Sequence, residues 1–441
     1  METKEKPRSQ DRFNQIIGRD GFSPDLPKAL AGGKLTGLSL GLRLLMHMFK
    51  GVRHGTLEVG LPNGETRRFY GAMPGPKGVL NIKSNRLMWY VMTHGEVGFG
   101  EAYLDGLWDS PDLAALLEVM HRNEPHYLGP YEKNWLARLW GWIQHKRRAN
   151  SREGARANIE YHYDLGNEFY KMWLDETLAY SSAIFGQADE SMVTSAGMFI
   201  RSDESLKEAQ LNKFKLMYER LDLKPEHHLL EIGSGWGGFA IYAAQHSGCR
   251  VTSITLSEEQ LTEARVRAVK AGVTDRVVFE LRDYRDVKQT YDRVVSIEMY
   301  EAVGEDYWKS WFDAIARALK PGGIAAIQGI TINGEIFDAY RLKRDFIQKY
   351  IFPGGMLCPP ERFQKLAGDA GLESHSPRFF AKDYADTLAI WHRNVLATHD
   401  RIVQMFDERF LRMWRYYLAY CECGFRAGSV DLMQITLRKS Q

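Results

Sequence analysis

The sequence predicts a two-domain α/β protein whose larger part is a Rossmann-like sheet with helices on both faces. The chain has 441 residues, which is too long for one ordinary domain. From residue 228 to residue 330, apolar strands alternate with amphipathic helices, an order typical of a parallel sheet. A glycine-rich turn, residues 233–238, follows the first of these strands. Ligands of such sheets bind at the carboxyl ends of the strands, so we expect the functional site there.

The composition narrows the class of protein. With 44% hydrophobic and 26% charged residues, the chain is globular and buries a large core. Its net charge of +2 offers no overall attraction for nucleic acid or acidic partners. The four cysteines form no CxxC pair, which indicates a reducing compartment and no metal site. The polar N-terminus resembles no signal peptide, and no apolar run is long enough to span a membrane, so we expect a cytoplasmic protein.

Residues 1–27 are predicted to form a mobile arm, and residues 28–145 a smaller mixed α/β domain. From residue 35 to residue 50, apolar side chains recur at helical spacing and predict an amphipathic helix. The stripe consists of Leu38, Leu42, Leu45 and Phe49. Such a stripe packs on the protein's own core or lies on a membrane, and both interpretations stay open.

Two further elements are predicted in this domain. Residues 55–71 alternate in polarity around an Asn63-Gly64 turn, which indicates a β-hairpin. Downstream, one helix is expected to end at Gly106 and a second to begin with an N-cap near Ser110.

A basic segment joins the two domains, with residues 146–160 assigned as the linker. Its cations and neighbouring tryptophans are Arg138, Lys146, Arg147, Arg148, Arg152, Arg156, Trp135, Trp140 and Trp142. Tryptophan beside lysine and arginine suits an anionic membrane surface. A solvated linker is the alternative. Nucleic acid is not predicted, because no basic domain or RNA-binding aromatic motif accompanies the segment.

Residues 161–441 are predicted to form the larger domain. Its sheet segments, in chain order, are HHLLEIG, CRVTSITLS, RVVFELRDY, YDRVVSIEMYEAVG and GIAAIQGIT. After residue 330 we expect a long irregular insertion, helical stretches around Trp391 and Trp414, and a final strand, VDLMQITLRK.

The glycine-rich turn predicts the cofactor. Gly233, Gly235 and Gly238 satisfy GxGxxG, which alone would suggest a dinucleotide and an NAD-dependent oxidoreductase. The second strand, however, ends without the acid that would hold a ribose hydroxyl. An acid stands instead at Glu231, two residues before the first glycine. This arrangement favours S-adenosylmethionine, whose cationic methionine end a carboxylate attracts.

Several separate segments carry a family resemblance. They are YHYDLGNEFY (161–170), LAYSSAIF (178–185), LEIGSGWGG (230–238), TLSEEQ (255–260), DYRDV (283–287), IEMYEAVG (297–304), IQKYIFPGG (347–355) and AYCECGFRAG (419–428). With them, the chain resembles the cyclopropane-fatty-acid synthase family of S-adenosylmethionine-dependent lipid methyltransferases. That family includes a subgroup that makes methyl-branched or methylene fatty acids. The resemblance implies a class I methyltransferase fold and an N-terminal lipid-binding domain.

The resemblance also implies the site residues. Cofactor contacts would come from Tyr180, Ser181, Glu231, Gly233, Gly235, Thr255, Ser257, Gln260, Asp283 and Tyr284. Catalytic positions, which in the family surround a bicarbonate ion that acts as base, would be Ser182, Glu301, Gln328, Ile330 and Tyr384, with His162 nearby.

The chain departs from the ring-forming enzymes at three of these positions. Those enzymes usually have Cys at Ser182, His at Ala302 and His at Gln328, whereas Glu301 and Tyr384 are retained. A glutamine cannot accept a proton at neutral pH, so the identity of the base stays open between bicarbonate and Glu301. The resemblance therefore favours a methyl-branched or methylene product, with a cyclopropane ring as the alternative.

The expected activity is the transfer of one carbon to the double bond of an unsaturated phospholipid acyl chain, at the inner leaflet of the membrane. A homodimer and a separate reductase acting on the product are compatible with it and stay open. The rival functions are a small-molecule methyltransferase, an NAD-dependent oxidoreductase and a lipid-binding protein without activity.

Overall fold

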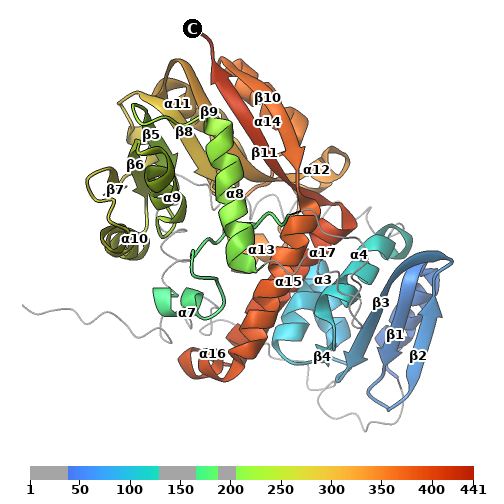
Figure 1. The fold of residues 1–441 in the computed structure, drawn as a ribbon. Helices are drawn as coiled ribbons and strands as arrows, with labels where there is room; N and C mark the ends of the chain where they lie inside the picture. Colours follow the sequence, from blue (N-terminus) through green and yellow to red (C-terminus); the bar gives the residue numbers. More distant parts are fainter. Residues whose placement is uncertain (1–37, 129–164, 187–204) are drawn as a thin grey trace, which may run out of the picture. The chain divides into compact units, whose positions relative to one another are not determined.

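The computed structural model describes residues 38–128, 165–186 and 205–441 (Figure 1). The predicted arm and basic linker lie outside these residues. The chain divides into two compact units that interleave along the sequence. Unit 1 comprises the chain up to Ala137 together with Asp345–Tyr350 and Val395–Ala427, and unit 2 comprises the rest. The predicted domain boundaries, which follow chain order, remain a prediction.

Unit 1 contains a four-stranded sheet in the order β2-β1-β3-β4. The strands are β1 (His54–Gly60), β2 (Thr66–Tyr70), β3 (Met73–Ile82) and β4 (Trp108–Asp109). The first two pair antiparallel around the Asn63-Gly64 turn, where Gly64 has φ of 86°. The predicted hairpin is therefore confirmed.

The helices of unit 1 include α2 (Leu40–Met48), whose stripe packs on the protein's own core. Leu42, Leu45 and Phe49 of the stripe are buried, while Leu40 on the opposite face is 84% exposed. The helical segments that follow are η2 (Phe49–Gly51), α3 (Leu87–Leu104), α4 (Leu113–Leu128), α13 (Phe346–Tyr350), α16 (His399–Met405) and α17 (Glu408–Ala427).

The predicted N-cap at Ser110 is wrong by two residues. Asp112 caps α4 instead, because its carboxylate accepts a hydrogen bond from the Ala115 N–H at 2.9 Å. The Ser110 hydroxyl donates to the Asp112 carbonyl and so supports the turn before the cap. Both residues are good N-caps, and the turn geometry selects between them.

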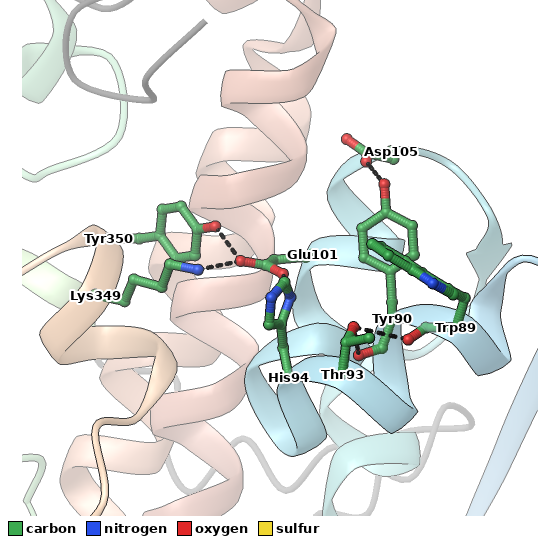
Figure 2. A network of polar contacts seen from close by, with 8 residues as sticks. All are labelled: Trp89, Tyr90, Thr93, His94, Glu101, Asp105, Lys349 and Tyr350. Atoms are coloured by element: carbon green, nitrogen blue, oxygen red, sulfur yellow. Dashed lines mark hydrogen bonds and ion pairs between the residues drawn. The ribbon is translucent and has the colours of Figure 1, made fainter. Parts of the chain in front are cut away.

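A polar network around Glu101 ties two distant segments of unit 1 together (Figure 2). The Glu101 carboxylate, 7% exposed, accepts hydrogen bonds from Lys349 Nζ, from the Tyr350 hydroxyl at 2.6 Å and from His94 Nδ1 at 2.8 Å. His94 precedes a kink in α3 at Gly95, where φ is 58°. The carboxylate thus holds α13 against α3, 248 residues away in the sequence.

Unit 2 is built on a seven-stranded sheet in the order β10-β11-β9-β8-β5-β6-β7. The strands are β5 (His228–Ile232), β6 (Arg250–Thr255), β7 (Val277–Leu281), β8 (Tyr291–Ile297), β9 (Leu319–Ile332), β10 (Leu372–Phe379) and β11 (Val430–Lys439). The five strands from β5 to β9 are parallel, as predicted, whereas β11 and β10 continue the sheet antiparallel. The strand order reverses between β5 and β8, which is the position where open α/β sheets bind ligands.

Helices cover both faces of this sheet. Neighbouring residues of one strand point to opposite faces, so Leu229 and Leu230 belong to different apolar clusters. The helical segments of unit 2 are α7 (Asn167–Lys171), α8 (Leu206–Leu221), α9 (Gly238–Ser247), α10 (Glu258–Ala271), η3 (Tyr284–Asp286), η4 (Tyr300–Val303), η5 (Glu305–Tyr307), α11 (Trp308–Ala318), α12 (Gly334–Tyr340), α14 (Pro360–Asp369) and α15 (Ala381–Ala397), the last of which continues into unit 1.

The insertion after residue 330 is not irregular, contrary to the prediction. It contains α12, α13 and α14 as well as the edge strand β10. β10 has mostly polar and exposed residues, because its position at the edge of the sheet leaves it open to water. Among the described residues, no helix is long and apolar enough to cross a membrane.

Candidate active site

The glycine-rich loop after β5 leaves room for a ligand. Gly233 and Gly235 have φ of 95° and 48°, values that favour glycine. The N–H groups of Gly233 and Ser234 donate to the Ile254 carbonyl at 3.0 Å, which ties the loop to β6. A Cβ on Gly233 would lie 3.1 Å from Met299 Cβ, whereas a Cβ on Gly235 would meet no atom within 4 Å. The open space therefore lies beside Gly235.

Glu231 lies inside the sheet, one residue before the end of β5. Its carboxyl accepts a hydrogen bond from the Ser253 hydroxyl of β6, and the residue is only 2% exposed. Burial raises the pKa of Glu231 to about 8, against the opposing effects of Ser253 and of the Lys213 charge. The structure thus bonds this predicted cofactor ligand to the neighbouring strand.

The predicted contacts at the end of β6 are bonded to one another. The Thr255 hydroxyl donates to the Gln260 side-chain oxygen at 3.0 Å and accepts from the Ser257 N–H at 3.1 Å. Ser257 in turn caps α10 by accepting from the Gln260 N–H. This network holds the β6 end in a defined shape next to the glycine-rich loop.

The predicted contacts after β7 complete the same edge of the sheet. Asp283 caps η3 and forms two side-chain hydrogen bonds with Arg285, at 2.9 and 2.6 Å. Tyr284 is buried, and burial raises the pKa of its hydroxyl. Because the carboxyl ends of parallel strands meet at one edge, the fold brings these residues to the side where Glu231 and the loop lie.

Tyr180 and Ser181 belong to the segment that precedes α8. The ring of Tyr180 packs against Tyr170, Trp173 and Trp391, with centroids 5.4–5.6 Å away. The Ser181 hydroxyl accepts a hydrogen bond of 2.6 Å from the ammonium group of a buried lysine, Lys213.

A second carboxylate, Glu298, gathers the predicted catalytic residues around itself. It is the first residue after β8. Its Oε1 accepts from the Ser182 N–H at 2.9 Å and from the Gln328 amide at 2.7 Å. Its Oε2 accepts from the Tyr384 hydroxyl at 2.5 Å. The structure therefore does bring Ser182, Gln328 and Tyr384 together, but around Glu298 and not around Glu301.

Glu301 lies three residues later, in η4. Its Oε1 accepts a 2.5 Å hydrogen bond from the Ile330 N–H, and its buried Oε2 has no partner among the described residues. Burial and the like charge of Glu298 raise the pKa of Glu301 to about 8. A buried oxygen without a hydrogen-bond partner keeps its lone pairs available to a proton or a ligand.

The donors expected to hold a bicarbonate ion are thus bonded to protein carboxylates. Ser182 N–H, the Gln328 amide and Tyr384 bond to Glu298, and Ile330 N–H bonds to Glu301. The Ser182 hydroxyl donates to the Ala183 carbonyl at 2.8 Å. These residues do not fit a bound bicarbonate in the arrangement that the structure shows.

Two residues of this site were missed from the sequence. Glu298 directly follows an apolar strand at the ligand-binding edge, and that position alone could have singled it out. Lys213 gives no such signal, because it occupies the buried face of an amphipathic helix, α8. His162 and the cationic segment around Arg147 lie outside the described residues.

Charge is balanced around the buried Lys213. Burial lowers the pKa of its ammonium group to about 8, against the attraction of Glu298, Asp175 and Glu231. Burial likewise raises the pKa of Glu298, while Lys213, Tyr384, Gln328 and Ser182 oppose the rise. The charge of Lys213 therefore favours the ionised forms of two carboxylates, Glu231 in β5 and Glu298 after β8.

Comparison with known proteins identifies the family. The family model of mycolic acid cyclopropane synthetase matches residues 150–435. Tuberculostearic acid methyltransferase UfaA1 of Mycobacterium tuberculosis is 39% identical over 346 residues, which cover 78% of this chain and 79% of that protein. Cyclopropane-fatty-acyl-phospholipid synthase of Escherichia coli is 33% identical over 366 residues, covering 82% and 87%.

Solved structures agree with this result. The crystal structure of mycolic acid cyclopropane synthase CmaA1, complexed with SAH and CTAB, superposes with a TM-score of 0.58. It is 28% identical and covers 64% of this chain and 98% of its own. SAH is S-adenosylhomocysteine, the product form of the methyl donor. The chain is therefore an S-adenosylmethionine-dependent methyltransferase with a class I fold, and it belongs to the mycolic acid cyclopropane synthetase family.

Proposed function

We propose that this enzyme transfers a one-carbon unit to the double bond of an unsaturated phospholipid acyl chain and gives a methylene or methyl-branched product. The observation that carries the proposal is the pair of half-buried glutamates after β8, Glu298 and Glu301, beside the glycine-rich loop. Methylation of an alkene leaves a carbocation. In its ionised form a carboxylate stabilises such a cation, and a raised pKa makes it a better acceptor for the proton that the cation loses.

The relatives support a fatty acyl substrate. One is named for tuberculostearic acid, and the other for cyclopropane fatty acyl phospholipid. The former has the higher identity to this chain, 39% against 33%, which favours the unsaturated or branched product over the ring.

The chain's own residues position the reaction. S-adenosylmethionine, when bound, supplies an electrophilic methyl group at the glycine-rich loop. Tyr180, with Tyr170, Trp173 and Trp391 around it, presents aromatic surface that suits an apolar chain and a cation. Gln328 holds a carboxylate through its amide N–H and accepts from Gln434 at 2.8 Å, so it orients the base without taking a proton.

Expression in a host without such enzymes tests the function. Mass spectrometry of the host's phospholipids should show acyl chains that contain one additional carbon. With methyl-deuterated methionine, a methylene or ring product keeps two deuterium atoms on the added carbon and a methyl product keeps three. Proton NMR then separates the methylene from the ring. A cyclopropane as main product would refute the product assignment, and unchanged lipids would refute the substrate. A saturated methyl branch needs a hydride, so a separate reductase would act on the product.

We propose that the loop at Gly235 holds the methyl donor, together with the strand ends at Thr255 and Asp283. Gly235→Ala should weaken binding of S-adenosylhomocysteine at least tenfold in calorimetry, because the added Cβ projects into the open space. Gly371→Ala is the matched control. Gly371 also has a positive φ, 77°, and an added Cβ there would also meet no atom within 4 Å. Equal affinity of the two variants would refute the assignment.

We propose that the basic segment binds the anionic inner leaflet of the membrane. Replacing Arg147, Arg148 and Arg152 by Glu should abolish flotation with anionic liposomes, and added salt should weaken flotation of the unaltered protein. The control reverses the same charge at three exposed lysines of unit 2, Lys215, Lys309 and Lys365. Equal loss in both triple variants would show that only net charge matters.

A further inference from the structure

Glu298 has a backbone conformation that is unfavourable for a glutamate. Its φ is 49°, in the left-handed region that favours glycine, and few other non-glycine residues of the described chain share it. The N–H of Glu298 donates to the Gln328 carbonyl at 2.8 Å, which holds the residue in place. The next residue, Met299, packs against Gly233 of the glycine-rich loop. Strain maintained next to a ligand-binding loop is typical of a functional residue.

The donors to this carboxylate come from three separate parts of unit 2. The Ser182 N–H precedes α8, the Gln328 amide projects from β9 and the Tyr384 hydroxyl from α15. All three donors are neutral, and they lower the pKa of the carboxyl by less than burial raises it. The two hydrogen bonds on Oε1 leave Oε2 with a single one, from Tyr384. A carboxylate oxygen has two lone pairs, so Oε2 keeps one for a proton.

We propose that Glu298 is the general base of the reaction and takes the place of an external anion. The inference rests on the proposed function. The alkene carbon bonds to the methyl carbon as the carbon–sulfur bond breaks, and the sulfur keeps that electron pair. The neighbouring alkene carbon becomes a cation. Removal of a proton by Glu298 Oε2 from a chain carbon next to the cation gives a methyl-branched alkene. When a hydride first shifts from the methylated carbon to the cation, the positive charge moves to the methylated carbon, and Glu298 Oε2 then removes a proton from the added methyl group to give the methylene. In both cases the electrons of the broken C–H bond form the new double bond. The proton on Glu298 passes to solvent after the product leaves.

The Glu298→Gln variant tests this role, because it keeps the size of the side chain and removes the base. Turnover should fall between about a hundredfold and ten-thousandfold, the usual contribution of a general base. Affinity for S-adenosylhomocysteine should stay within about threefold of the unaltered enzyme, since the glycine-rich loop is untouched. Any cation still formed should be captured by water, giving a methylated hydroxy acyl chain heavier by one water than the methylene product. Glu373→Gln, at an exposed glutamate of β10, is the matched control.

A second variant keeps the test decisive. Glu298→Gly suits the left-handed backbone, so it should fold, and it leaves a gap where the carboxylate stood. Added formate or bicarbonate should raise the turnover of Glu298→Gly at least tenfold. Neither anion should stimulate the unaltered enzyme. Removal of bicarbonate should also leave the unaltered enzyme fully active.

The outcomes separate the two proposals. If the unaltered enzyme methylates no unsaturated lipid, the proposed function fails. If it does so but Glu298→Gln keeps turnover within threefold, or if the unaltered enzyme needs bicarbonate, the role of Glu298 is wrong.

Discussion

Glu101 of unit 1 and Glu298 of unit 2 are both carboxylates that accept three hydrogen bonds, one of them from a tyrosine, yet their pKa values shift in opposite directions. At Glu101 burial would raise the pKa, but the bonds from Lys349 and Tyr350 and the charge of Lys349 lower it (Figure 2). At Glu298 burial prevails and the pKa is raised, although Lys213 opposes it.

The difference lies in the donors. A cation, Lys349, bonds directly to Glu101, whereas only neutral groups bond to Glu298. A carboxylate paired with a cation stabilises the fold in its charged form. One held by neutral donors keeps its affinity for a proton. The kind of donor, and not the number of hydrogen bonds, distinguishes a structural glutamate from a reactive one.

The largest expected effect is on stability. Glu101→Gln leaves Lys349 without its counter-charge and should lower the free energy of unfolding by about 2–3 kcal/mol, less than the loss of a fully buried ion pair, because the Lys349 side chain is 31% exposed. The same change at Glu298 removes a carboxylate that is costly to bury and should leave the urea midpoint unchanged or raised. Urea unfolding followed by circular dichroism measures both. An equal loss of stability in the two variants would show that Glu101 and Glu298 do not differ in their contribution to the fold.

The contributions of Glu301 and Glu101 to stability should also depend on pH in opposite directions. Glu301 has a pKa of about 8 in the folded protein and about 4.5 when unfolded. The folded state thus binds more protons between these values, and stability falls as pH rises from about 4.5 to 8. The pKa of Glu101 is lowered, so its contribution is present above its unfolded pKa and is lost as pH falls. Melting temperatures of Glu301→Gln and Glu101→Gln are each subtracted from those of the unaltered protein across about pH 3–8. The Glu101 contribution should fall as pH drops below about 4.5, whereas the Glu301 contribution should fall as pH rises above about 4.5.

Lys213 should set the pH at which the base works. Its Nζ bonds to Ser181, and its charge favours the ionised forms of Glu298 and Glu231. Lys213→Met removes that charge, which further raises the pKa of Glu298. The acidic limb of the pH–rate profile should therefore move to higher pH. Lys215→Met, on the exposed face of the same helix, should leave the pH–rate profile unchanged. If Lys213→Met left the pH–rate profile unchanged, Lys213 would not influence the pKa of the base.

The smallest effect compares the two tyrosines. Tyr350→Phe removes one of three bonds from the structural carboxylate and should cost about 1 kcal/mol of stability with little change in turnover. Tyr384→Phe should also cost about 1 kcal/mol of stability but lower turnover about tenfold, because Glu298 loses its orientation. Turnover measured beside urea midpoints checks both. A loss of turnover in Tyr350→Phe alone would reverse the assignment of the clusters.

Much of the fold follows from local sequence patterns. The Asn63-Gly64 turn, the apolar strands from β5 to β9 and the glycines at 233 and 235 act over a few residues, so each was predicted from its own segment. Predictions failed where two equivalent candidates lie close together or where a strand lacks an apolar pattern. Ser110 and Asp112 both cap helices well, and β10 lies at a polar edge.

The sequence by itself determined the sheet, the position of its ligand-binding edge and the type of methyl donor, because strand periodicity and glycine turns are local properties. The tertiary structure alone decided that Glu298, and not Glu301, meets Ser182, Gln328 and Tyr384. These residues stand 116, 30 and 86 positions away from it along the chain. Which of two carboxylates three residues apart receives such donors depends on the turn after β8 and on the packing of distant elements. Neither leaves a mark in the sequence around them.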